Sequence, residues 1–210
     1  MIGLIMGPQG SGKGTQAERI EKEFGFKQLS TGDMMRAERA KDTERGRMIK
    51  ELIDAGNLVP SDITSEMTHE EMIKYENVLL DGYPRSMDQT EYINKHFKVD
   101  FIILIDISEE ETIKRLEKRR ICTTTKKIFI ADKITQADID ECTAAGGEII
   151  QRDDDKPEAI KHRLNIYHEQ TRPVVDFFEK KGTPVFRIKG EQSIDDVWKD
   201  IKEKLEGVLS

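Results

Sequence analysis

The stretch IGLIMGPQGSGKG, residues 2–14, decides the fold of this chain of 210 residues. Its first five residues form a short apolar run, which is typical of a buried strand in a parallel sheet. Gly7, Gly12 and Lys13 then follow the spacing of a phosphate-binding loop, in which backbone N–H groups surround phosphate oxygens at a helix N-terminus. Because the loop joins a predicted strand to a helical pattern, we expect it to bind phosphate rather than to serve as a plain glycine turn.

Three further apolar runs repeat the pattern of the first strand, at residues 78–80, 101–105 and 185–188. Helical patterns separate these runs, at roughly 13–24, 45–55, 62–74, 88–96, 109–119, 157–180 and 194–206. Strands that alternate with helices predict an α/β fold with three layers (α/β/α), in which a parallel sheet with right-handed crossovers has helices on both faces.

Two segments do not fit this alternation. Residues 31–60 are helical and polar, and residues 121–155 contain short β-like pieces, a glycine pair and an aspartate run. We interpret both as insertions at the carboxyl edge of the sheet, where the ligand loops of this architecture gather. The predicted organisation is a core of residues 1–29, 61–120 and 156–210, one insertion at 30–60 and a second at 121–155.

The amino-acid composition narrows the kinds of binding partner and the cellular compartment that we expect for this protein. The formal net charge is −7, with 41 acidic against 34 basic residues, which argues against nucleic acid or an anionic membrane as a partner. No apolar run reaches the length of a membrane span, and the start of the sequence does not resemble a signal peptide. Two cysteines are too few for a secreted disulfide scaffold. We expect a cytoplasmic protein that is a monomer.

Several spaced motifs resemble those of the adenylate kinases of the long-lid bacterial type, and together they cover nearly the whole chain. They are GPQGSGKGTQ (7–16), STGDMMR (30–36), LDGYPR (80–85), RRIC (119–122), QRDDD (151–155) and IKG (188–190). The resemblance implies a reversible, Mg²⁺-dependent transfer of a phosphoryl group from ATP to AMP, giving two ADP. It also implies that the insertion at 30–60 binds the nucleoside monophosphate and that the insertion at 121–155 is a lid.

Transfer between two nucleotides brings together phosphate groups that repel one another, so such a site needs cations for positioning and charge stabilisation. Arginine suits this task because its planar fork binds phosphate in two places and stays charged. A single arginine in so charged a chain could equally be a solvated surface residue. By resemblance, we expect as catalytic residues Lys13, Arg85, Arg119, Arg152 and Arg163.

The resemblance also implies contacts to the two nucleotides. The expected ATP-binding residues are Gly10, Ser11, Gly12, Lys13, Gly14, Thr15, Arg119, Ile128, Phe129 and Gln192. The expected AMP-binding residues are Thr31, Arg36, Asn57, Leu58, Val59, Gly82, Tyr83, Pro84, Arg85, Gln89, Arg152 and Arg163. Ile128 and Phe129 could instead belong to the core of the lid.

The prediction that the acceptor base is adenine rests on Thr31 and Gln89, which match the pattern of adenine-binding members of the family. A glutamine amide both donates and accepts, so it can pair with an adenine edge. The related uridylate/cytidylate kinases carry Ala and Asn near these places, and a UMP/CMP kinase is therefore the nearer alternative. Gln89 could also be an ordinary polar residue in the first turn of a helix. A P-loop ATPase or switch protein is the alternative from another class, and it has no use for the acceptor motifs.

Metal ligands are the last set of expectations. Gly14 stands where most phosphate loops carry a magnesium-binding Ser or Thr, so we expect Asp81, with Asp33, to hold Mg²⁺ through water. Asp81 could alternatively cap the following turn. Long lids often carry zinc on two Cys pairs, but here only Cys122 and Cys142 remain of the four positions. We therefore expect no structural zinc. The two cysteines could lie close enough for a disulfide, but a reducing compartment favours free thiols, which we expect.

Overall fold

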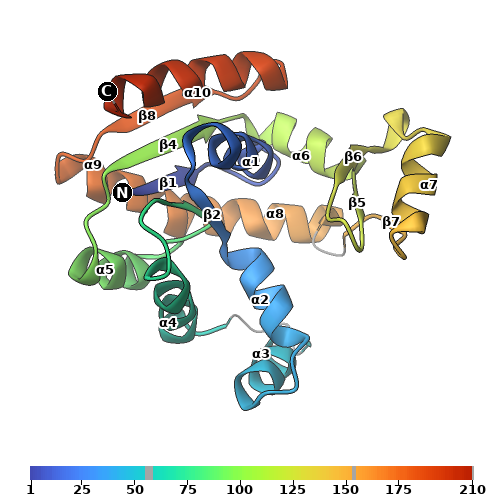
Figure 1. The fold of residues 1–210 in the computed structure, drawn as a ribbon, viewed down its shortest axis with the longest axis horizontal. Coiled ribbons are helices and arrows are strands. Elements are labelled where there is room, and N and C mark those ends of the chain that lie inside the picture. The colour runs from blue at the N-terminus through green and yellow to red at the C-terminus, as the bar shows by residue number, and fades with distance from the viewer. Residues whose placement is uncertain (55–58, 153–154, 210) are drawn as a thin grey trace.

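The computed structural model describes residues 1–54, 59–152 and 155–209, and its centre is a parallel sheet in the strand order β2-β3-β1-β4-β8 (Figure 1). The strands are β1 (Ile2–Met6), β2 (Lys27–Ser30), β3 (Val78–Asp81), β4 (Phe101–Asp106) and β8 (Val185–Lys189). The α/β class and the four predicted strands are confirmed. β2 was not predicted, because it is an edge strand in which only Leu29 is buried.

Apolar side chains alternate along the strands and build one cluster on each face of the sheet. In β1, Leu4 and Met6 join one cluster, whereas Ile5 joins the other cluster on the opposite face. In β3, Leu80 joins the cluster of Leu4 and Met6, and Leu79 joins the cluster of Ile5. This alternation follows from the period of two in a strand, and it accounts for runs that are apolar throughout.

Helices cover both faces and lie close to their predicted places. They are α1 (Lys13–Phe24), α4 (Ser61–Met72), α5 (Met87–His96), α6 (Glu109–Lys118), α8 (Pro157–Ile166), α9 (Arg172–Lys180) and α10 (Ile194–Leu209). The single helix predicted at 157–180 is divided by a π-helical turn at Tyr167–Thr171. Pro173 follows this turn and has no N–H to donate to the carbonyl four residues earlier, which favours the wider turn.

A helical hairpin, α2 (Thr31–Arg39) and α3 (Glu44–Asp54), leaves the carboxyl end of β2 on the side of the molecule away from the chain termini (Figure 1). The Ser30 side chain caps α2 by accepting from the Asp33 N–H at 3.4 Å. Glu38 is buried in this hairpin and accepts hydrogen bonds from Lys41 at 2.7 Å and Arg45 at 3.3 Å. Arg45 also pairs with Glu70 of α4, so charge contacts join the hairpin to the core.

The predicted lid has its own small antiparallel sheet, in the strand order β6-β5-β7. Its elements are β5 (Arg119–Cys122), β6 (Ile128–Ile130), a short 3₁₀ turn at Ala131–Lys133, α7 (Gln136–Ala144) and β7 (Ile149–Ile150). The core of this segment consists of Cys122, Phe129 and Cys142, with Ile134 and Ile149 packed against them.

The expectation of free thiols was wrong, because Cys122 and Cys142 form a disulfide. The packing of α7 on the inner face of β5 brings their Cα atoms to 5.9 Å, within the range that a disulfide spans. Both sulfurs are therefore taken up by a covalent crosslink in the centre of the lid. No group of three or more His, Cys, Asp or Glu arranged to hold a metal ion occurs among the described residues.

Across residues 1–54, 59–152 and 155–209, no helix combines the length and the apolar character that crossing a membrane requires.

Candidate functional site

A cleft of about 1160 Å³ opens at the carboxyl edge of the sheet, between the phosphate loop (residues 7–13), the α2–α3 hairpin and the lid. A pocket for one drug-sized ligand is roughly 300–1,000 Å³, so this cleft has room for more than one small ligand. Twelve Lys and Arg side chains line it against six Asp and Glu, among the residues that the structure describes. The cleft is thus basic although the protein as a whole is acidic.

The phosphate loop depends on glycine at its first position. Gly7 has φ +141°, and a Cβ there would lie 2.2 Å from the backbone oxygen of Ile105, a distance that no side chain could occupy. The Lys13 ammonium donates to the backbone oxygens of Gly7 and Pro8, at 2.8 Å each. The lysine therefore lies over the loop and is aimed at the space where the N–H groups of the loop would hold phosphate.

The pKa of Lys13 is lowered to about 8, chiefly by burial and also by the positive charges of Arg85, Arg163 and Arg119, against the raising effect of Asp81. Burial of the ammonium is the largest cause of this low pKa, and the smaller effects of the three arginines show that other cations lie near Lys13. A phosphate group at this point would reverse the effect by supplying negative charge. Its arrival would hold Lys13 in the protonated form.

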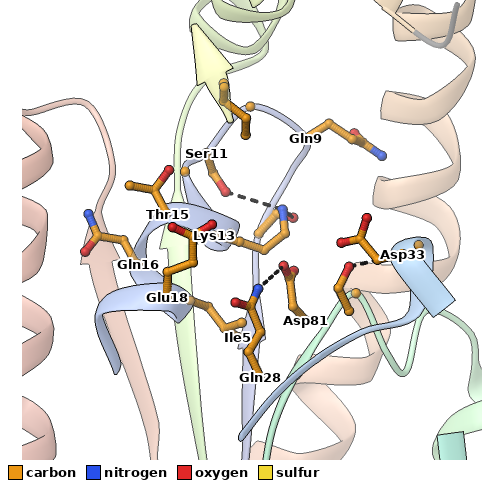
Figure 2. Close-up of a pocket in the computed structure, with 18 of the residues that line it drawn as sticks. Ile5, Gln9, Ser11, Lys13, Thr15, Gln16, Glu18, Gln28, Asp33 and Asp81 are labelled. Atoms are coloured by element: carbon orange, nitrogen blue, oxygen red, sulfur yellow. Dashed lines mark hydrogen bonds between the residues drawn. The ribbon is translucent and has the colours of Figure 1, made fainter. Parts of the chain in front are cut away.

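Asp81 ends β3 beside Lys13, as Figure 2 shows, and it accepts a hydrogen bond from Gln28 Nε2 at 3.3 Å. Burial raises the pKa of Asp81, although Lys13 and Arg85 act in the opposite direction. A Cβ built on Gly14 would lie 3.8 Å from Asp81 Oδ2. The carboxylate thus lies beside the place where other phosphate loops carry a hydroxyl.

Asp33 and Arg36 form an ion pair on the first turns of α2, with Arg36 Nη2 donating to Asp33 Oδ1 at 2.6 Å. Burial alone would raise the pKa of Asp33, but the hydrogen bonds from Arg36 and Ser30 and the charges of Arg36 and Arg152 lower it. Asp33 is therefore a carboxylate at neutral pH, and both side chains line the cleft.

Arg85 lies on the same wall of the cleft as α2 and donates from Nε to the Gly82 backbone oxygen at 2.7 Å. Thr31 and Gln89 support this wall from behind. The Thr31 hydroxyl also donates to the Gly82 oxygen at 2.8 Å, and Gln89 Oε1 accepts from the Arg85 N–H at 2.8 Å. Neither Thr31 nor Gln89 is among the described residues that line the cleft, so their predicted contact with the acceptor base stays a prediction.

Arg119, at the root of the lid, makes a two-pronged ion pair with Asp155, at 2.8 Å from Nε and 2.6 Å from Nη2. The Arg163 Nη1 atom of α8 lies 3.6 Å from the same carboxylate, which is fully buried. Because a buried carboxylate between two arginines fixes both, Asp155 sets where these cations face the cleft. Asp155 lies in the QRDDD motif but was not predicted as a site residue.

The lid presents one face to the cleft. Ile121 and Ile128 are cross-strand partners, and Ile130 lies two residues further along β6 on the same face. All three line the cleft, and Ile128 is 51% exposed. Phe129 points the other way into the lid core yet also borders the cleft. The lid-core interpretation therefore holds for Phe129, and the predicted contact of Ile128 with ATP stays a prediction.

Arg115 lines the cleft and was missed from the sequence. It lies one helical turn before Arg119 on α6 and donates to the backbone oxygens of Gly10 at 3.3 Å and Gly190 at 2.9 Å. The helical pattern at 109–119 placed Arg115 one turn before the predicted site residue Arg119, and this spacing could have identified it.

The structure brings most of the predicted residues into this one cleft. Those that line it are Gly10, Ser11, Gly12, Lys13, Gly14, Thr15, Asp33, Arg36, Asp81, Gly82, Tyr83, Pro84, Arg85, Arg119, Ile128, Phe129, Arg152, Arg163 and Gln192. Val59 is half-buried and, like Thr31 and Gln89, is not among the described lining residues. Asn57 and Leu58 lie outside the described residues.

Comparison with known proteins agrees with this geometry. The family model described as Adenylate kinase matches residues 5–183. Curated relatives named adenylate kinase include that of Petrotoga mobilis, 36% identical over 94% of each chain, and that of Archaeoglobus fulgidus, 36% identical over 99% of each chain. The adenylate kinase of Streptococcus thermophilus is 39% identical, with 98% of each chain covered.

Proposed function

Since this chain belongs to the adenylate kinase family, we propose that it catalyses the reversible transfer of a phosphoryl group from ATP to AMP, giving two ADP. The observation that carries the proposal is the cleft itself. It is large enough for two nucleotides, and it surrounds a phosphate loop with cations in a protein whose net charge is −7. A site with that charge pattern favours several phosphate groups held close together.

Different residues would bind the two nucleotides at the two ends of the cleft. The phosphate loop, from Gly10 to Thr15, would hold the phosphates of ATP through backbone N–H groups, while Lys13 reaches the oxygens nearest the transfer point. Arg36 and Arg85, on the opposite wall, would hold the phosphate of AMP. The two reactants are then aligned for in-line transfer, which requires little covalent action by the protein.

Arg119, Arg152 and Arg163 would stabilise the charge that spreads over the phosphoryl group during transfer. Two of them are pre-positioned by Asp155, so little reorganisation is needed when the nucleotides arrive. Closure of the lid over the cleft would exclude water and so suppress hydrolysis of ATP.

The carboxylates present fit Mg²⁺, which prefers hard oxygen ligands and keeps several of its waters. Asp33 and Asp81 lie near enough for the charge of Asp33 to raise the pKa of Asp81, and both line the cleft. They would hold such an ion through water, and the ion would neutralise part of the phosphate charge. Their placement favours this role for Asp81 over the capping of a turn.

The acceptor is expected to be AMP, and the regions at 30–60 and 121–155 are expected to act as the AMP-binding segment and the lid. The covering of the cleft by α2 and by β6 supports these roles. We also expect a cytoplasmic enzyme that works as a monomer. A UMP/CMP kinase and a P-loop ATPase are the alternatives.

Assays with a panel of acceptors would distinguish among an adenylate kinase, a UMP/CMP kinase and a P-loop ATPase. ATP and Mg²⁺ are offered with AMP, CMP, UMP or GMP, or with no acceptor, and ADP is measured by a coupled assay. We expect turnover with AMP to exceed that with any other acceptor. Faster turnover with CMP or UMP would support the pyrimidine kinase, and equal ADP without an acceptor would support the ATPase.

A further inference from the structure

The side chain of Gln9, at the tip of the phosphate loop, has no role in the mechanism above. Its amide oxygen is buried and accepts no hydrogen bond within the described chain. Buried polar atoms are nearly always paired, so an unpaired one in a binding cleft indicates a partner that reaches it only when the cleft is filled.

Two other buried side-chain oxygens in the described chain also lack a partner, those of Gln16 and Thr112. Gln16 is anchored by its other end, since its Nε2 donates to the Ile194 oxygen at 2.9 Å. Thr112 lies on α6 and does not belong to the described lining of the cleft. Gln9 differs from both because it lines the cleft and its amide oxygen has no partner among the described residues.

The direction of the side chain places it where transfer would occur. Figure 2 shows Gln9 leaving the loop on the side of Asp33, away from Thr15 and Gln16. It therefore points from the ATP-binding loop toward the wall that would hold the acceptor. Figure 2 also shows Lys13 between Thr15 and Asp33. Its ammonium donates to the backbone oxygens of Gly7 and Pro8, the two residues that precede Gln9.

An amide differs from the cations around it because it donates and accepts at once. Ionised phosphates offer only acceptors, so they can take a hydrogen bond from Nε2 but cannot satisfy the buried oxygen. The guanidinium groups of the cleft offer only donors, so they can satisfy the oxygen. A glutamine between phosphates and arginines would have both of its ends paired.

We propose that Gln9 is a substrate-binding residue of the transfer step, which donates from its amide nitrogen to the phosphoryl group in transfer and accepts from a cleft arginine. The inference rests on the proposed ATP-to-AMP reaction. The contact requires both nucleotides, because the arginines and the phosphoryl group meet only when the cleft is filled and closed. Gln9 then contributes to turnover more than to the binding of ATP alone.

Replacing Gln9 by Leu tests the proposal, because leucine keeps the size and removes both hydrogen-bonding ends. For Q9L we expect kcat about tenfold lower, with both KM values changed less than twofold, since a hydrogen bond to a charged group is lost at the transfer point. Q9E keeps the shape but replaces the donor with a negative charge, and it should lose more activity than Q9L. T112V is the matched control, because it removes an unpaired buried oxygen outside the cleft, and its kcat should equal that of the wild type.

Calorimetry supplies a readout that does not need turnover. The probe is a bisubstrate analogue, two adenosines joined by five phosphates, compared with ATP alone. Q9L should bind the analogue about tenfold more weakly and ATP within twofold of the wild type. Equal analogue affinity in Q9L and wild type would overturn the role of Gln9, whether or not the enzyme turns over. A wild-type protein that binds the analogue but makes no ADP from ATP and AMP would overturn the proposed function alone, and one that does not bind the analogue would overturn both.

Discussion

The core and the lid face the same cleft but are held together in different ways. The core has an apolar cluster on each face of a five-stranded sheet, and Leu4, Ile5 and Leu80 are fully buried there. The lid has one small cluster of three buried residues, two of which are the disulfide-bonded cysteines. Burial of apolar area stabilises the first region, whereas a crosslink replaces much of that burial in the second.

This difference in packing separates the roles of the core and the lid. The phosphate loop follows β1, Asp81 ends β3 and Arg85 lies four residues beyond it, so their positions are set by a rigid scaffold. The lid contributes an apolar face around Ile128, and an arginine of the cleft lies near each of its ends, Arg119 and Arg152. We therefore expect changes in the core to affect transfer most strongly, and changes in the lid to affect its local stability.

The largest effect is expected from R85A, which removes a core cation from the wall of the cleft. The kcat should fall by about a thousandfold, because a preorganised charge at the transfer point is lost. The fold should be unaffected, since Arg85 is exposed. Steady-state kinetics with AMP and thermal unfolding check both parts. R187A is the control, because Arg187 pairs with Glu179 at the surface, and full activity of R85A would remove Arg85 from the catalytic residues.

D155N tests the junction between the two regions. Replacing the carboxylate leaves Arg119 and Arg163 without their shared partner, so kcat should fall by about a hundredfold through misplaced cations. The free energy of unfolding should fall by about 3 kcal/mol, since one member of a buried ion pair is removed. Chemical denaturation and kinetics measure the two effects.

D195N is the matched control for that variant, because Asp195 pairs with Arg19 at 2.8 Å but is almost fully exposed. A surface pair of this kind contributes on the order of 1 kcal/mol or less. If D155N behaved like D195N in both measurements, Asp155 would not be the residue that links lid and core.

The double variant C122A/C142A tests the lid alone. The disulfide joins residues separated by 20 positions, and its loss should lower the local stability of the lid by about 3 kcal/mol. Hydrogen exchange followed by mass spectrometry should show faster exchange in residues 119–150 and unchanged exchange in the strands of the core. Equal acceleration in β1 and β4 would mean that the two regions unfold together.

The smallest effect is a pH dependence that belongs to the core. The pKa of Lys13 is lowered to about 8 in the nucleotide-free protein, and bound phosphate should raise it. Lys13 therefore loses its proton on ATP release above pH 8, and ATP affinity should fall about tenfold between pH 7 and pH 9. Calorimetric titration of ATP at several pH values measures this. K13R stays charged over the range, so a slope that persisted in K13R would assign the effect to another group.

The sequence predicted the core better than the lid, and particular residues explain why. The strand at 2–6 and its loop are recognisable because burial on both faces requires an unbroken apolar run. β2 escaped prediction because an edge strand can keep polar residues such as Lys27 and Gln28. α7 has a weak apolar stripe, although the capping box of Thr135 and Asp138 was a usable signal.

The site residues likewise divide into those that the sequence predicted and those that it did not. Lys13 and Arg85 stand in motifs whose spacing carries the chemistry, and the structure places both in the cleft. The partnership of Asp155 with Arg119 spans 36 positions, and the pairing of Cys122 with Cys142 depends on how α7 packs on β5. Contacts of this kind depend on tertiary packing, which no local pattern in the sequence encodes.

The most direct test of the account follows the phosphoryl group itself. ATP labelled in its γ-phosphate is incubated with the protein, Mg²⁺ and AMP, and the products are separated over time. Direct transfer in the cleft predicts that the label appears in the ADP formed from AMP, with little in inorganic phosphate. Label that accumulates in inorganic phosphate at the same rate with and without AMP would contradict the account.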